Sequence, residues 1–180
     1  MAENVSASSV LLRFYRGEGP DAAGRHIDEI WSWDHRRLEM VHDYIQWLFP
    51  LPDASRFNPD APLLTAADAT AFHNDPTLRS RLMRSLDLML AFYGLMRTGD
   101  AVTRGAAFAQ RQCDWLTPAN HNYLRLTRIV LCLRHCGVEA VARGLFTRLE
   151  DIAAHEGKGL IAERTLGFWR AAVKEPLPKT

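Results

Sequence analysis

Apolar residues recur at spacings of three and four along most of the 180-residue chain, and glycine or proline separates one such stretch from the next. This spacing is typical of helices with one buried face, and there is no strand-like alternation and no run rich in valine and isoleucine. The length suits one domain, since a chain of this size buries roughly 70% of its unfolded surface. We therefore predict one all-α domain over residues 1–180, an irregular, orthogonally packed bundle of six to eight helices, with residues 1–12 and 175–180 flexible.

Start and stop signals divide the chain into segments. Asp75-Pro76 and Thr117-Pro118 each place a capping side chain before a proline at the first helical position, and Gly94 and Gly137 are natural stops. Val10 to Tyr15 is expected to be extended. The expected helices run from about Ala22 to Trp31, Asp34 to Phe49, Thr65 to Phe72, Pro76 to Tyr93, Ala101 to Cys113, Thr117 to Cys136, Glu139 to His155 and Leu160 to Val173.

The net charge is only +1, but it is unevenly distributed. Residues 1–78 carry a balance of −6, from six arginines and twelve acidic residues, whereas residues 79–148 carry +7, from eleven arginines and four acidic residues. The arginine-rich middle segment is either neutralised inside the molecule by the acidic first segment or available to bind nucleic acid. We favour neutralisation, because nucleic-acid modules usually carry a positive surplus over the whole domain.

No apolar run approaches the length of about twenty residues that a membrane span requires, and the first residues lack the continuous apolar stretch of a signal peptide. An odd number of cysteines, three, fits a reducing compartment, so we expect a cytoplasmic protein. We expect no metal and no cofactor. His42-Asp43 lacks further metal ligands at suitable spacing, and Cys132 and Cys136 lack a second pair.

Four pieces of sequence, in order, resemble the conserved N-terminal region of the opioid growth factor receptor family. They are Phe14-Tyr15 with Pro20-Asp21 and Ile27-Asp28-Glu29, His42 to Leu51 (HDYIQWLFPL), Met89 to Gly94 (MLAFYG) and His121 to Ile129 (HNYLRLTRI). The resemblance covers roughly residues 13–150, and the second piece is the most specific.

The resemblance implies an all-helical fold without transmembrane spans. Eukaryotic members of that family bind the pentapeptide Met-enkephalin and act as growth-regulating receptors. The present chain ends where the conserved region ends and looks microbial in composition, so we expect a stand-alone, microbial member.

Two parts of the resembling pieces carry candidate binding residues. On the expected helix from Asp34 to Phe49, His42 and Gln46 lie four apart on one edge of the apolar stripe, and Tyr44 and Trp47 widen that stripe. His42 and Gln46 are either a pocket wall or a structural hydrogen-bond network, and buried polar groups more often serve the second purpose.

The helix expected to open at Thr117 offers the better candidate site. His121, Arg125 and Arg128 lie on one face, and Asn120 and Asn122 add amides near the positive end of the helix dipole. The competing interpretation is that Arg125 and Arg128 form ion pairs with the acidic first segment, for instance with Asp43.

We therefore predict a binding or interaction domain whose site lies between these two stretches and takes a short peptide or a small amphiphilic anion. Tyr44 and Trp47 would supply apolar contact, and Arg125 with His121 the counter-charge. Two alternatives stay open: an enzyme that uses His42 or His121 as a general acid–base, and a nucleic-acid binder that uses the arginine-rich segment.

Overall fold

The computed structural model describes residues 9–55 and 58–174. Within these ranges the chain forms ten helices and one antiparallel hairpin of two strands. They are α1 (Val10–Arg16), α2 (Ile27–Trp31), α3 (His35–Met40), α4 (Ile45–Leu48), α5 (Ala66–Asn74), α6 (Pro76–Tyr93), β1 (Leu95–Thr98), β2 (Ala101–Arg104), α7 (Phe108–Trp115), α8 (Asn122–His135), α9 (Glu139–Ala154) and α10 (Glu163–Lys174). The fold is predominantly helical as predicted, but it has more helices than expected and is not purely α.

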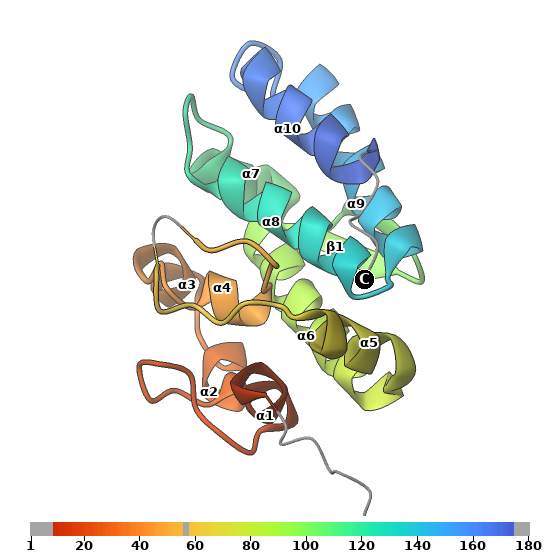
Figure 1. Ribbon diagram of the computed structural model, residues 1–180. Coiled ribbons are helices and arrows are strands. Elements are labelled where there is room, and N and C mark those ends of the chain that lie inside the picture. The colour runs from red at the N-terminus through yellow and green to blue at the C-terminus, as the bar shows by residue number, and fades with distance from the viewer. Residues whose placement is uncertain (1–8, 56–57, 175–180) are drawn as a thin grey trace, which may run out of the picture.

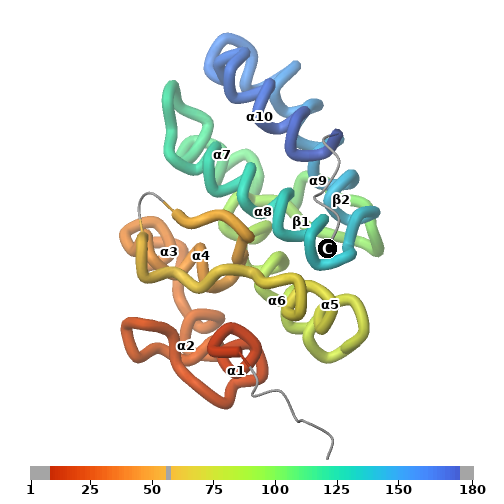
Figure 2. The backbone as a smooth tube through the Cα atoms, viewed as in Figure 1, coloured from red at the N-terminus to blue at the C-terminus, as the bar shows by residue number. Residues whose placement is uncertain are grey.

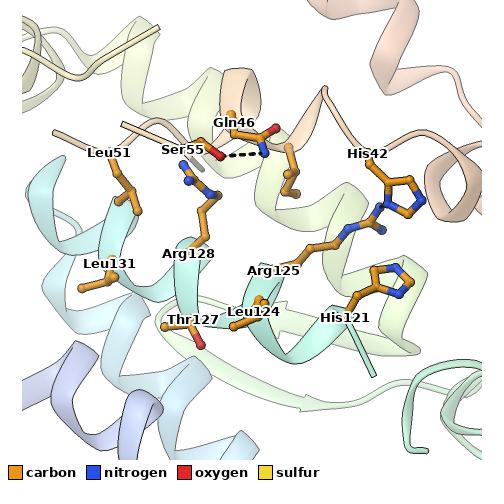
Figure 3. Close-up of a pocket in the computed structure, with 11 residues that line it drawn as sticks. His42, Gln46, Leu51, Ser55, His121, Leu124, Arg125, Thr127, Arg128 and Leu131 are labelled. Carbon is orange, nitrogen blue, oxygen red and sulfur yellow. Dashed lines mark hydrogen bonds between the residues drawn. The ribbon is translucent and has the colours of Figure 1, made fainter. Parts of the chain in front are cut away.

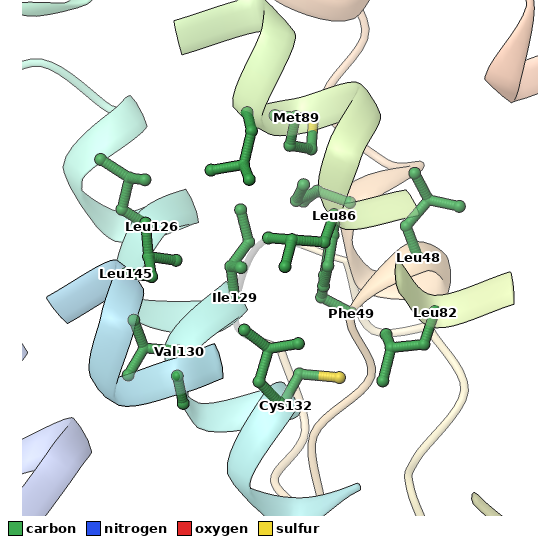
Figure 4. Packing of buried hydrophobic residues seen from close by; sticks show 14 of the residues in the cluster. Leu48, Phe49, Leu82, Leu86, Met89, Leu126, Ile129, Val130, Cys132 and Leu145 are labelled. Atoms are coloured by element: carbon green, nitrogen blue, oxygen red, sulfur yellow. The ribbon is translucent and has the colours of Figure 1, made fainter. Parts of the chain in front are cut away.

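Helix α8 lies at the centre of the molecule (Figure 1). Helices α9 and α10 pack on one side of it, and the N-terminal helices α1 to α4 lie on the other (Figures 1 and 2). In the core, Leu126 and Ile129 of α8 lie toward side chains of α6 and toward Phe49, whereas Val130 lies beside Leu145 of α9 (Figure 4). All the buried apolar residues of the described ranges belong to one cluster, which supports the proposal of a single domain.

Helix α6 forms where its sequence signals predicted. The Asp75 carboxylate accepts hydrogen bonds from the backbone N–H groups of Thr77 (2.8 Å) and Leu78 (3.4 Å), and Pro76 occupies the first turn. Gly94 ends the helix at φ 75°, where a Cβ atom would lie 2.7 Å from Cα of Phe108. Only glycine therefore allows α7 to pack so close to this turn.

The first described segment corrects the expectation that Val10 to Tyr15 is extended. It is helix α1, because Ser9 Oγ accepts the N–H of Leu12 at 3.1 Å as an N-terminal cap. Leu11 and Leu12 are buried, so the flexible N-terminal segment predicted for residues 1–12 does not extend this far. Residues 1–8 and 175–180 lie outside the described residues.

The hairpin corrects the helix expected from Ala101 to Cys113. Strands β1 and β2 pair through a two-residue loop in which Gly99 adopts φ 58°. Each strand has four residues, too few for alternation to stand out, and the burial of Leu95 and Val102 holds the hairpin against the core.

The single helix expected from Asp34 to Phe49 is interrupted. Helix α3 ends at Met40, Val41 is extended (φ −93°, ψ 135°), and α4 begins only at Ile45. A continuous helix would satisfy the carbonyls of Leu38 and Val41 from its own next turn. Here the guanidinium of Arg125 donates to both instead, at 3.0 and 2.9 Å, which stabilises the break.

Helix α8 begins at Asn122, five residues after the predicted cap at Thr117. Ala119 adopts a left-handed conformation (φ 58°), which a helix does not allow. The Asn120 side chain donates to Oγ1 of Thr117 at 2.9 Å, and Tyr123 Oη donates to the Thr117 carbonyl at 2.8 Å. These bonds stabilise a turn in place of the first helical turn.

Candidate functional site

A pocket of about 360 Å³ lies between the first half of α8 and the segment that contains α4 (Figure 3). It brings together two stretches about eighty residues apart in the sequence, as the sequence predicted. It is lined by His42, Ile45, Gln46, Leu51, Ser55, His121, Leu124, Arg125, Thr127, Arg128 and Leu131.

Five of the nine predicted binding residues line this pocket, namely His42, Gln46, His121, Arg125 and Arg128. The other four do not. Tyr44 and Trp47 are buried in the core, where Trp47 packs edge-on against Phe14 with ring centroids 5.2 Å apart. Asn120 and Asn122 are used in hydrogen bonds around the start of α8.

The apolar contact expected from Tyr44 and Trp47 comes instead from Ile45, Leu51, Leu124 and Leu131, which sequence reasoning missed. Leu124 is 51% exposed. A signal did exist in the sequence: Leu124 and Leu131 lie at i and i+7 on α8, outside the stripe that faces the core.

Arg125 is the most enclosed polar side chain of the pocket, with 5% of its surface exposed. Besides the two carbonyls at the helix break, its guanidinium donates to Oδ1 of Asn122 at 3.3 Å and to Nδ1 of His42 at 3.0 Å. Its nearest carboxylate is Glu39, at 3.7 Å, and not Asp43, which pairs with Arg25. Four of the five N–H groups of Arg125 are therefore already used by groups of the protein.

Glu39 is a further residue that sequence reasoning missed, and no motif pointed to it. Its carboxylate accepts a hydrogen bond from Nδ2 of Asn122 at 3.1 Å and lies 3.4 Å from Nε2 of His121. Since Glu39 also faces Arg125, it joins α3 to the start of α8 through three partners.

The rings of His42 and His121 lie edge to face, with centroids 5.1 Å apart, and both side chains are exposed to solvent. An arginine N–H can only donate, so Nδ1 of His42 accepts and the proton of the neutral ring is on Nε2. Burial lowers the pKa of His121, and the charge of Arg125 and the ring of His42 lower it further. The carboxylate of Glu39 acts in the opposite direction and raises it, but the net shift is downward. His121 is thus held in its neutral form more strongly than an ordinary histidine.

Gln46 serves the structure as well as the pocket. In one orientation its amide nitrogen lies 3.5 Å from Oγ of Ser55, and in the reversed orientation it donates to the carbonyls of Asp43 (3.1 Å) and His42 (3.2 Å). The reversed orientation satisfies both ends of the amide, so we assign Gln46 to the stabilisation of the interrupted segment.

Arg128 differs from Arg125 although the two lie one turn apart. It donates to the carbonyl of Phe49 at 3.1 Å, and no carboxylate among residues 9–55 and 58–174 lies within 4.0 Å of it. Burial lowers the pKa of Arg128, because the buried guanidinium loses hydration and no described carboxylate compensates for this loss.

Nothing in the described part of the chain assembles a metal site: it contains no group of three or more histidine, cysteine or acidic side chains placed to hold an ion. The sulfur atoms of Cys132 and Cys136 lie 4.0 Å apart, both buried, and burial raises the pKa of Cys132. Both thiols therefore contribute to the packing of the core. Among the described helices, none combines the length and the apolar character needed to traverse a lipid bilayer.

Comparison with known proteins agrees with the resemblance of the four sequence pieces. The family model for the opioid growth factor receptor conserved region matches residues 4–178. The mouse opioid growth factor receptor is 40% identical over 71% of this chain and 21% of its own length, and the human one is 37% identical over 91% of this chain and 25% of its own length. Mouse opioid growth factor receptor-like protein 1 is 35% identical over 72% of this chain and 29% of its own length. No solved structure matches.

The chain thus spans between a fifth and a third of the length of these relatives, while the family model covers nearly all of the chain and every residue of the pocket. On this evidence the chain belongs to the opioid growth factor receptor conserved-region family.

Proposed function

We propose that the pocket beside α8 is a binding site for a short peptide or a small amphiphilic anion. The observation that carries this proposal is an apolar pocket that contains a half-buried arginine with no carboxylate partner among the described residues. Its volume of about 360 Å³ is in the range of sites for small ligands, which combine apolar walls with a few placed polar groups.

The relatives support a binding role in a limited way. Two of them are named receptors, and the family model that matches this chain over residues 4–178 includes the pocket. Because this chain spans only a minor part of their length, their activity as whole proteins comes to it only as a proposal.

A comparison of two matched variants tests the proposal. Leu124, 51% exposed, lies in the pocket, and Met96, 49% exposed, lies on β1 outside it. With N-acetyl-leucyl-leucine as the probe, amide chemical shifts should change in residues 45–55 and 121–131. Leu124→Asp should abolish these changes and Met96→Asp should leave them intact, whereas equal behaviour of the two variants would exclude the pocket.

A second candidate function, general acid–base catalysis, is favoured by the neighbouring rings of His42 and His121 with Glu39 at 3.4 Å from His121. A carboxylate that orients an exposed imidazole is the arrangement of a general base. Hydrolysis of p-nitrophenyl octanoate that is lost in His121→Gln but kept in His155→Gln, another exposed histidine beside a carboxylate, would support this function.

The nucleic-acid alternative gains little support. Nine of the eleven arginines between residues 79 and 148 lie within 4.0 Å of a carboxylate of the described part of the chain, all except Arg79 and Arg128. The sequence analysis expected these partners in the acidic first segment. Most of them lie instead in the middle and C-terminal segments. A neutralised surface binds polyanions weakly, and filter binding at low salt would test this directly.

The cytoplasmic location also stays a proposal. It is supported by the three cysteines, which are all free thiols, since an oxidising compartment favours disulfides. Localisation of a fluorescent fusion in the source cells would test it.

A further inference from the structure

We infer that the ligand of this pocket carries a single carboxylate that pairs with Arg128 and an apolar chain that lies against Leu51 and Leu131. This inference rests on the proposed function and deepens it by naming the anchoring residue and the chemical class of the ligand.

Arg128 has donors to spare. A guanidinium carries five N–H groups, and one of them is used by the Phe49 carbonyl at 3.1 Å. The side chain is half-buried and lines the pocket, and no described carboxylate lies within 4.0 Å. Burial lowers the pKa of Arg128, so a bound anion would regain the stabilisation that the cation has lost on leaving water.

Arg125 is a poor anchor in comparison, although the sequence favoured it. Two backbone carbonyls, Asn122 and His42 occupy its donors, and Glu39 supplies a counter-charge at 3.7 Å. A ligand that competed for Arg125 would have to break the bonds that hold the interruption between α3 and α4.

The charge of the pocket selects a monoanion. Among the described residues no aspartate or glutamate lines it, Glu39 balances the charge of Arg125, and burial lowers the pKa of His121, which favours its neutral form. Within this described lining, Arg128 is the positive charge without a counter-charge. A carboxylate would neutralise it, whereas a phosphate dianion would bury a surplus negative charge.

The surroundings of Arg128 select the rest of the ligand. Leu124, Arg128 and Leu131 follow one another on the same face of α8, and Leu51 faces them across the pocket (Figure 3). An apolar group attached close to the carboxylate would therefore lie on aliphatic side chains. The C-terminal leucine of a peptide and a medium-chain fatty acid both have this chemistry.

Calorimetric titration of four probes tests the inference. N-acetyl-leucyl-leucine should bind about tenfold to hundredfold more tightly than its C-terminal amide, and octanoate more tightly than octyl phosphate. Tighter binding of the peptide than of octanoate would identify a peptide C-terminus as the source of the carboxylate, and the reverse order a fatty acid.

Two matched variants complete the test. Arg128→Met should reduce the affinity for the peptide acid to that for the amide, and Arg128→Lys should restore part of it. Arg79→Met is the control, because Arg79 is also half-buried and also lacks a carboxylate within 4.0 Å among the described residues. It donates to the carbonyls of Phe72 and His73, and none of these three residues lines the pocket.

The failures are distinguishable. Equal binding of the acid and the amide, or tighter binding of octyl phosphate than of octanoate, would overturn the carboxylate assignment while the binding pocket stands. No binding of any probe at millimolar concentration would overturn both this inference and the proposed function.

Discussion

The two ends of the pocket use an arginine in opposite ways. At one end Arg125 is almost fully buried and shared among two carbonyls, an asparagine, a histidine and a glutamate. At the other end Arg128 has one carbonyl and a wall of leucines. A charged side chain in a pocket is therefore a candidate for binding a ligand only when groups of the protein have not already taken up its hydrogen-bond donors and its charge.

The largest effect on stability is expected at the end of the pocket that contains Arg125. Arg125→Ala leaves the carbonyls of Leu38 and Val41 without donors and Glu39 without its buried counter-charge, so unfolding should become easier by roughly 3 kcal/mol or more. Urea denaturation followed by circular dichroism measures this. A loss below about 1 kcal/mol would show that Arg125 is not structural and would erase the contrast with Arg128.

A smaller effect is expected from Glu39→Gln. The amide keeps a partner for Asn122 but removes the negative charge beside Arg125 and His121. Because Glu39 is partly exposed, solvent screening limits the loss to about 1 kcal/mol. The same denaturation experiment measures this loss. Glu29→Gln is the control: its partner Arg37 is exposed, so its change in the free energy of unfolding should be near zero.

The end of the pocket that contains Arg125 and His121 should also respond to acidification. The pKa of His121 lies below its ordinary value of 6.5, so the unfolded chain takes up this proton before the folded one does as the pH falls. The free energy of unfolding should therefore decline below about pH 6.5 and recover above it. His35 and His135 act in the same direction, since burial lowers their pKa values too.

Comparison with His121→Gln isolates the contribution of His121. Between about pH 7 and pH 5 the free energy of unfolding of this variant should decline less than that of the unmodified chain. Parallel curves would mean that the contacts with Glu39 and Arg125 do not couple His121 to folding.

The smallest effect on stability is expected at the other end. Arg128→Met loses one hydrogen bond to Phe49, worth about 1 kcal/mol, and gains from removing a half-buried charge with no described counter-ion. The two terms should nearly cancel, so the midpoint of urea unfolding should hardly move. A destabilisation as large as that of Arg125→Ala would show that Arg128 too is a structural residue.

Much of the fold was predictable because its signals are local. Asp75-Pro76 at the start of α6 and Gly94 at its end act within one or two turns, and the structure has that helix between them. The Ser9 cap of α1 is equally local and was overlooked. The hairpin was missed because strands of four residues carry little periodicity.

The candidate site was predictable in its location and less so in its parts. The motif residues His42, Gln46, His121, Arg125 and Arg128 do meet at one pocket. Glu39 and Leu51 could not be identified, because their partners lie far away in the sequence. For the same reason Tyr44 and Trp47 could not be assigned to the core rather than to the pocket wall.

The helical character of the chain and its family could be recognised from the sequence, because periodicity, caps and short motifs each involve residues close together in the chain. The break in the helix after Asp34, and the arginine that keeps unused donors in the pocket, became visible only in the folded structure. Both outcomes depend on hydrogen bonds between segments that are distant in the sequence. Arg125, more than eighty residues from the break, supplies the donors that stabilise it, whereas Arg128 uses one N–H group, for the carbonyl of Phe49.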